Sequence, residues 1–160
     1  GANASDRFDK IVLANTTCHF ADPSRFQDRI KAVTQNGVAS IADQVIPTWL
    51  TQDFRERDPT TTQEIRRMFA ATPLEGYVGC CAAISGTDFY TPTSGLRLPT
   101  LGIAGTEDGS TPPDLVKETV DLIPGSRFRL IRKAGHLPCV EKPDEYAEIL
   151  TGFLKDIGHV

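Results

Sequence analysis

The last third of the chain alternates between two hydrophobic patterns, and this alternation limits the possible fold more than any other feature. The runs LPTLGIAG (98–105) and RFRLIR (127–132) are short and rich in branched or aromatic side chains, as strands are. Between them, TPPDLVKETVDLIPG (111–125) predicts a helix with Thr111 as its N-cap, and a second amphipathic helix ends near Gly158. This order predicts an α/β fold, in which a parallel sheet is flanked by helices.

The first two thirds of the chain predict one more strand and then only helices. KIVLANTT (10–17) is an apolar run that fits a buried parallel strand ending near Asn15. Four helical segments follow without a strand, the first ending at Gly37 and the second reaching Trp49 with a kink or end at Pro47. The phrases TTQE (61–64) and TPLE (72–75) match the capping box and predict two further helix starts.

These patterns predict three parts of the chain. Residues 1–21 hold a core strand preceded by GANA, which resembles the end of a helix; residues 22–85 form a helical cap; and residues 86–160 form the second part of the α/β core. The linking phrase DFYTPTSG (88–95) is rich in turn-forming residues and separates the last two parts.

Charge and cysteine content point to a soluble protein with a small-molecule partner. The net charge is -4 and no basic stripe occurs, which argues against nucleic acid or an anionic membrane as a partner. The four cysteines lack a C-x-x-C pair and any metal-ligand spacing, so reduced thiols and a cytoplasmic location are expected. Neither a membrane-spanning run nor a signal peptide is recognisable, and no metal or organic cofactor is predicted.

Two titratable residues directly follow predicted strands. Asp108 comes after the strand at 98–105, and His136 comes after the strand at 127–132. Because parallel strands end at one rim of the sheet, a carboxylate and an imidazole are expected to meet there, and the carboxylate would then fix the imidazole tautomer. A strand-end Asp followed by a strand-end His is the order of the last two members of a hydrolase triad. Glu107, the neighbour of Asp108, is expected to be a solvated charge.

Five stretches of the chain resemble the 3-oxoadipate enol-lactonases, a family of α/β-hydrolases. They are DRFDKIVLANT, TWLTQDFRER, EGYVGCCAAI, GIAGTEDGSTPP and AGHLPCVEKPDEYAEILTGFL. The resemblance implies that Asp108 is the triad acid, His136 the base, and residues 22–85 a helical cap over the substrate. It implies hydrolysis of an enol-lactone that carries a carboxylate, in the β-ketoadipate pathway of aromatic catabolism.

The family's nucleophile lies in a G-x-S-x-G elbow, and residues 1–160 contain no such pentapeptide. The sequence therefore resembles the C-terminal portion of an α/β-hydrolase, without the serine and the oxyanion hole. We expect the isolated chain to be inactive and to be bound to the missing N-terminal half, on the same or a companion chain.

Several residues and functions allow more than one interpretation. Trp49 and Tyr77 are candidate substrate contacts, although aromatics at helical spacing also serve as core. Cys80 and Cys81 are expected to be small buried hydrophobes, and His19 and His159 to be surface or packing residues. Arg66 and Arg67 are expected to be solvated on a helix, although they could attract a substrate carboxylate. The alternatives to lactone hydrolysis are another cofactor-free hydrolase chemistry (haloperoxidase, esterase or carbon-carbon bond hydrolase) and a non-catalytic binding subunit.

Overall fold

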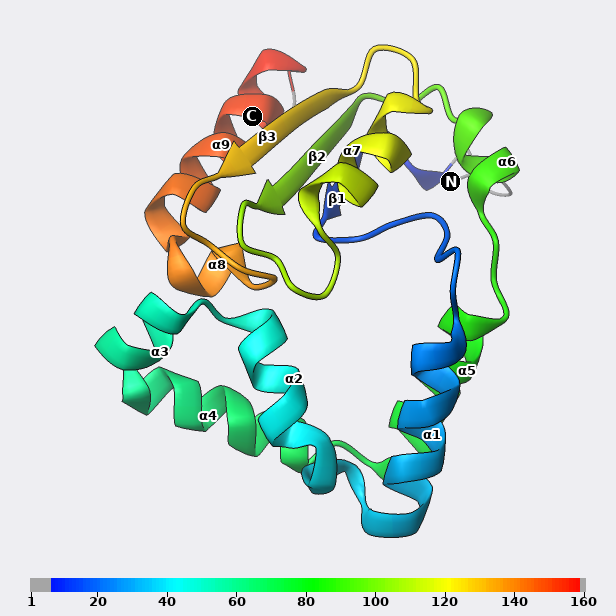
Figure 1. Cartoon of the computed structure of the whole chain (residues 1–160). Helices are drawn as coiled ribbons and strands as arrows, with labels where there is room; N and C mark the ends of the chain where they lie inside the picture. The colour runs from blue at the N-terminus through cyan, green and yellow to red at the C-terminus, as the bar shows by residue number, and fades with distance from the viewer. Residues whose placement is uncertain (1–6, 159–160) are drawn as a thin grey trace.

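The computed structural model describes residues 7–158 and contains a parallel sheet with helices on both faces (Figure 1). The strands are β1 (Ile11–Ala14), β2 (Thr100–Gly105) and β3 (Arg127–Ile131), in the order β1-β2-β3, and both pairs are parallel. The register places Leu13 beside Gly102 and Gly102 beside Phe128. The predicted α/β class and the three predicted strands are therefore confirmed.

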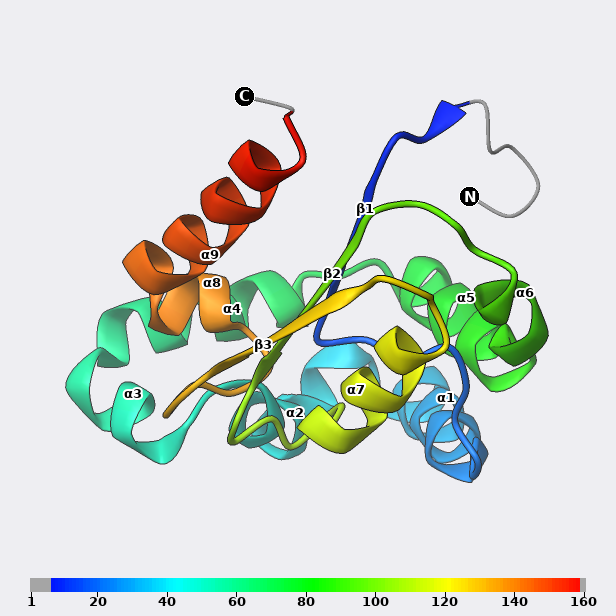
Figure 2. The same ribbon diagram turned by 90° about the horizontal axis from the view of Figure 1, so that it is seen from above.

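Two helices cover the opposite faces of this sheet, as Figure 2 shows. Helix α7 (Pro113–Asp121) packs Val116 and Val120 against Ala104 on one face, and α9 (Pro143–Asp156) packs Phe153 against the other. A Cβ atom at Gly102 would lie only 2.3 Å from Cγ2 of Val120, so the close approach of α7 to β2 requires a glycine there. Strand β2, the middle strand, is thus buried on both faces, as in a parallel sheet, whereas β1 and β3 are only partly buried.

Between β1 and β2, residues 24–85 are mostly helical and lie beyond the carboxyl ends of the strands (Figure 1). This segment consists of α1 (Ser24–Asn36), a 3-10 helix η2 (Val38–Ile41), α2 (Ala42–Trp49), α3 (Gln52–Arg57), α4 (Pro59–Ala70) and α5 (Leu74–Ser85). Helix α1 packs against α5. The shared core of this segment is formed by Val33, Val38, Ile41, Ala42, Val45, Ile46, Leu50, Phe54 and Phe69.

Three predicted helix starts were wrong. Helix α4 begins two residues before Thr61, because Asp58 is its N-cap: the Asp58 side chain accepts a hydrogen bond from the Thr61 N–H, and Pro59 occupies the first helical position. Helix α5 starts after Pro73, without a side-chain cap from Thr72. Helix α7 starts at Pro113 rather than after Thr111, whose N–H donates instead to the carboxylate of Asp108.

The helical stretches are also divided more finely than the sequence predicts. The predicted helix from Val38 to Trp49 is split into η2 and α2, and α2 ends two residues after Pro47. The predicted link contains a short helix, α6 (Tyr90–Ser94), and another, α8 (Pro138–Glu141), precedes α9. The expected helix end at GANA lies outside the described residues. Within residues 7–158, no helix combines the length and apolar character needed to cross a bilayer.

Candidate functional site

The structure brings Asp108 and His136 together at the carboxyl ends of β2 and β3. Oδ2 of Asp108 lies 2.9 Å from Nδ1 of His136, within hydrogen-bond distance. The side chain of Asp108 is fully buried, whereas that of His136 is 22% exposed. The imidazole therefore has one nitrogen held by a buried carboxylate, and its other nitrogen, Nε2, lies on the opposite edge of the ring.

The carboxylate of Asp108 is held as an anion by several hydrogen bonds. Oδ1 accepts from the N–H groups of Ser110 (2.7 Å) and Thr111 (2.9 Å), so the turn after β2 folds around it. Burial raises the pKa of Asp108, but the hydrogen bonds from His136, Asn15 and Thr111 lower it by more. The pKa of Asp108 therefore lies below the ordinary value of 3.8. An ionised partner of this kind favours the imidazole tautomer that carries its proton on Nδ1.

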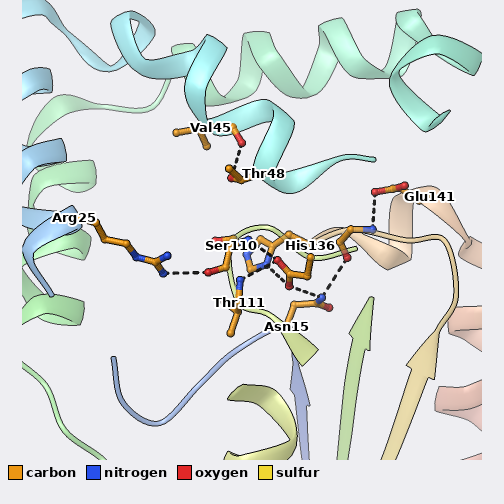
Figure 3. Close-up of polar contacts among 10 residues, drawn as sticks. Asn15, Arg25, Val45, Thr48, Ser110, Thr111, His136 and Glu141 are labelled. Carbon is orange, nitrogen blue, oxygen red and sulfur yellow. Dashed lines mark hydrogen bonds and ion pairs between the residues drawn. The ribbon is translucent and has the colours of Figure 1, made fainter. Parts of the chain in front are cut away.

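Asn15 is a third member of this cluster, and sequence reasoning did not assign it a role. Its Nδ2 donates to Oδ2 of Asp108 (2.9 Å) and to the carbonyl oxygen of Gly135 (3.3 Å). Figure 3 shows Asn15 close to His136. It is the first residue after β1 and has a φ of 50°, a left-handed conformation that asparagine tolerates better than most residues. Asn15 therefore connects the end of β1 to both halves of the Asp–His pair.

Glu141, which sequence reasoning also missed, holds the loop that carries His136. Its buried carboxylate accepts hydrogen bonds from the N–H of Gly135 (3.0 Å), the N–H of Thr51 (3.2 Å) and Oγ1 of Thr51 (2.7 Å). The Trp49 carbonyl oxygen accepts a further bond from the N–H of His136 (2.8 Å). The end of α2 and the start of α3 thus position the histidine through backbone groups.

A cavity of about 520 Å³ lies beside this pair, and both predicted substrate contacts line it. The Trp49 ring lies 6.2 Å from the His136 ring, measured between centroids, and 5.3 Å from the Phe69 ring. Tyr77 packs against Phe69 from α5. Both aromatic side chains therefore border the cavity and contact the core of the helical segment. Arg25, Arg29, Ser110 and Cys81 also line this cavity.

Other described residues considered from the sequence form no hydrogen bond or ion pair with Asp108 or His136. Glu107 is exposed, as expected. Arg66 forms an ion pair with Asp43 (2.7 Å) and Arg67 is exposed. The expectation of two buried cysteines was half wrong: Cys81 is buried, but Cys80 is exposed, because it lies on a different side of helix α5.

His19 is exposed, and its Nδ1 lies 3.7 Å from Oδ2 of Asp88. His159 lies outside the described residues. In the described part of the chain, no group of three or more His, Cys, Asp or Glu side chains is arranged to hold a metal ion.

The chain is similar to known hydrolases in sequence and in fold. No protein-family model matches the chain. The chain is 28% identical to 3-oxoadipate enol-lactonase 1 of Acinetobacter baylyi over 98% of its own length. Its structure superimposes on the enol-lactonase from Burkholderia xenovorans LB400 with a TM-score of 0.92 and 31% identity over 96% of the chain. The chain is a relative of the α/β-hydrolases.

A second hydrolase structure supports the same relationship. The present chain superimposes on a thermophilic esterase from Thermogutta terrifontis with a TM-score of 0.88 and 26% identity over 97% of the chain. The chain spans 59% of the length of the two enol-lactonases and 58% of that of the esterase. The fold is thus that of a large part of an α/β-hydrolase.

Proposed function

We propose that this chain supplies the acid and the base of a serine-type ester hydrolase. The observation that carries the proposal is the 2.9 Å contact between the buried carboxylate of Asp108 and Nδ1 of His136 at the rim of a cavity. A structural histidine would need neither an ionised partner held by three further donors nor a place on a cavity wall.

In the proposed mechanism, Nε2 of His136 accepts the hydroxyl proton of a serine as the serine oxygen attacks the ester carbonyl carbon. Asp108 keeps the Nδ1 proton in place and stabilises the imidazolium that forms. When the tetrahedral intermediate collapses, the carbon-oxygen bond to the leaving group breaks and His136 donates its proton to the leaving oxygen. His136 then removes a proton from water as the water oxygen attacks the acyl-serine, and it returns this proton to the serine oxygen when the acyl–oxygen bond breaks and the acid leaves.

The substrate we propose is 3-oxoadipate enol-lactone, the substrate named for the Acinetobacter relatives. The relationship covers nearly the whole of this chain, and Trp49 and Tyr77 give the cavity apolar walls that suit a small ring. The helical segment of residues 22–85 would act as a cap over this ring and exclude water from the acyl intermediate.

The serine and the oxyanion hole must come from other residues, because no G-x-S-x-G pentapeptide occurs in residues 1–160. We propose that they lie on a polypeptide that pairs with β1. This strand pairs with β2 along one edge, and the residues of β1 remain partly exposed in the described structure. The open edge of an apolar strand favours pairing with another strand.

The test is an assay of lactone hydrolysis by the purified chain, alone and mixed with a polypeptide that carries the earlier strands and the serine elbow of a relative. We expect no turnover by the chain alone and turnover by the mixture that His136→Ala abolishes. A panel containing a simple ester, a carbon-carbon bond substrate and a halide oxidation assay identifies the chemistry. Turnover by the chain alone that His136→Ala removes would mean that it has its own nucleophile. Equal turnover of the mixture with and without His136 would contradict the proposed base.

A further inference from the structure

The cavity beside the Asp–His pair is lined by two arginines, and none of its described lining residues is a carboxylate. Arg25 and Arg29, one turn apart on α1, both line the cavity, and no Asp or Glu of the described chain is among the lining residues. We propose that Arg25 binds a carboxylate of the substrate and so makes this hydrolase selective for anionic esters. This inference rests on the proposed function, since it assigns the residue that would bind the free carboxylate of the lactone.

Arg25 is held in a fixed orientation with part of its guanidinium unused. Its Nη2 donates to the carbonyl oxygen of Ser110 (3.1 Å), as Figure 3 shows. Its guanidinium carbon lies 4.4 Å from the ring centre of Phe20 and 4.7 Å from that of Phe26. Nε of Arg25 is buried and has no hydrogen-bond partner among the described residues. The guanidinium is thus oriented in advance, and its buried Nε–H is left unpaired within the described chain.

An anion is the ligand that this environment favours most. A buried donor without a partner costs free energy, and a carboxylate oxygen satisfies such a donor with a charge-assisted bond. Burial and the charge of Arg29 lower the pKa of Arg25, while the charge of Asp108 raises it. A negative charge on a ligand beside Arg25 would compensate the effects of burial and of the Arg29 charge. Arg29 would itself add to the attraction for this anionic ligand.

The position of Arg25 also sets where the carboxylate must lie on the substrate. The Ser110 carbonyl that Arg25 binds belongs to the turn whose N–H groups hold Asp108. The anion site and His136 are therefore two walls of one small cavity, and a ligand must carry its carboxylate only a few bonds from the ester. A neutral ester of the same shape offers Arg25 only an uncharged carbonyl oxygen, whose hydrogen bond is weaker than that of a carboxylate.

The experiment measures binding to the 160-residue chain by the fluorescence of Trp49, its single tryptophan, which lines the cavity. The probes are monomethyl glutarate, an anionic ester, and dimethyl glutarate, its uncharged counterpart. We expect the anionic ester to bind about 10–100-fold more tightly than the diester, the range for one hydrogen bond to a charged group. Arg25→Met should remove this preference and leave the affinity for the diester unchanged. Arg66→Gln, which removes an arginine that does not line the cavity, should retain the preference.

Each other outcome is decisive. If the unmodified chain binds both esters equally, or if Arg25→Met keeps the preference, the proposal is wrong. If Arg25→Met lowers the affinity for both esters equally, Arg25 only positions the Ser110 turn and the proposal is also wrong. If Arg25→Met does not fold, Arg25→Gln replaces it and should lose most of the preference, because the amide carries no positive charge. Binding needs no turnover, so a failure of lactone hydrolysis with the preference intact contradicts the proposed function alone.

Discussion

The N–H of His136 donates to the carbonyl oxygen of Trp49 over 2.8 Å, so the histidine at the rim of the sheet is fixed to the last residue of α2. The same carbonyl accepts from the N–H of Leu137 at 3.3 Å. The helical segment therefore does more than cover the cavity, because its backbone sets the position of the proposed base. Changes at this contact should affect the histidine without touching its ring.

Gly135, the residue before His136, lies so close to Trp49 that no room is left for a side chain. A Cβ atom at Gly135 would lie 2.6 Å from the Trp49 carbonyl oxygen and 3.0 Å from Oε1 of Glu141. Gly135→Ala should therefore force the loop away from α2 and lower the free energy of unfolding by about 1–3 kcal/mol in urea titrations. Gly152→Ala is the matched control: it adds a methyl group in open space inside α9 and should raise stability by up to about 1 kcal/mol. Equal effects of the two substitutions would contradict the steric explanation.

Thr51→Val should also destabilise the chain. The substitution keeps the shape of the side chain but removes the hydroxyl that donates to Oε2 of Glu141 and accepts from the N–H of Phe54 at the start of α3. A buried carboxylate oxygen then loses its partner, and we expect a loss of about 1–3 kcal/mol in the free energy of unfolding. Thr151→Val, at an exposed position of α9, serves as the control and should change stability by less than about 0.5 kcal/mol. A Thr51→Val chain as stable as the control would mean that Glu141 does not need this bond.

Asp108 should give stability that depends on pH in the acid range. Its pKa in the folded chain is lower than the ordinary 3.8, so its contribution is fully present above that value and is lost as the pH falls through the folded pKa. The difference in unfolding free energy between the unmodified chain and Asp108→Asn should therefore shrink as the pH falls below about 4. Urea titrations from pH 6 to pH 3 measure it. Glu107→Gln, at the exposed neighbouring position, is the control and shows how removal of any nearby negative charge changes the unfolding free energy. A difference that grows toward acid pH would show that the shift has the opposite sign.

In an active hydrolase that contains this chain, Asp108→Asn should lower kcat by up to about ten-thousandfold. The amide cannot hold the Nδ1 proton as the carboxylate does, and serine proteases lose that much when the triad acid is replaced in this way. The KM should change little, because Asp108 is covered by the Ser110 turn and does not line the cavity. Glu107→Gln should change kcat less than about twofold. If the two substitutions had equal effects, Asp108 would not be the triad acid.

The sequence by itself determined the order of the elements and the two residues at the rim. Strand and helix periodicities depend on neighbours in the chain, and they placed β1, β2 and β3 correctly. The rule that parallel strands end at one edge then brought Asp108 and His136 together, because it needs only the position of each residue after its strand. Local signals failed where two of them competed, as at the start of α4, where Asp58 and Pro59 replaced the predicted capping box.

Only the tertiary structure decided which residues hold and surround this pair. Asn15 contacts Asp108 across 93 positions of sequence, Thr51 contacts Glu141 across 90, and Arg25 contacts Ser110 across 85. None of these partners has a periodic or motif signal, because a hydrogen bond between distant residues depends on the path of the whole chain rather than on its neighbours. The physical reason is burial: a polar group removed from water must find a donor or acceptor, and folding alone determines which one lies within reach.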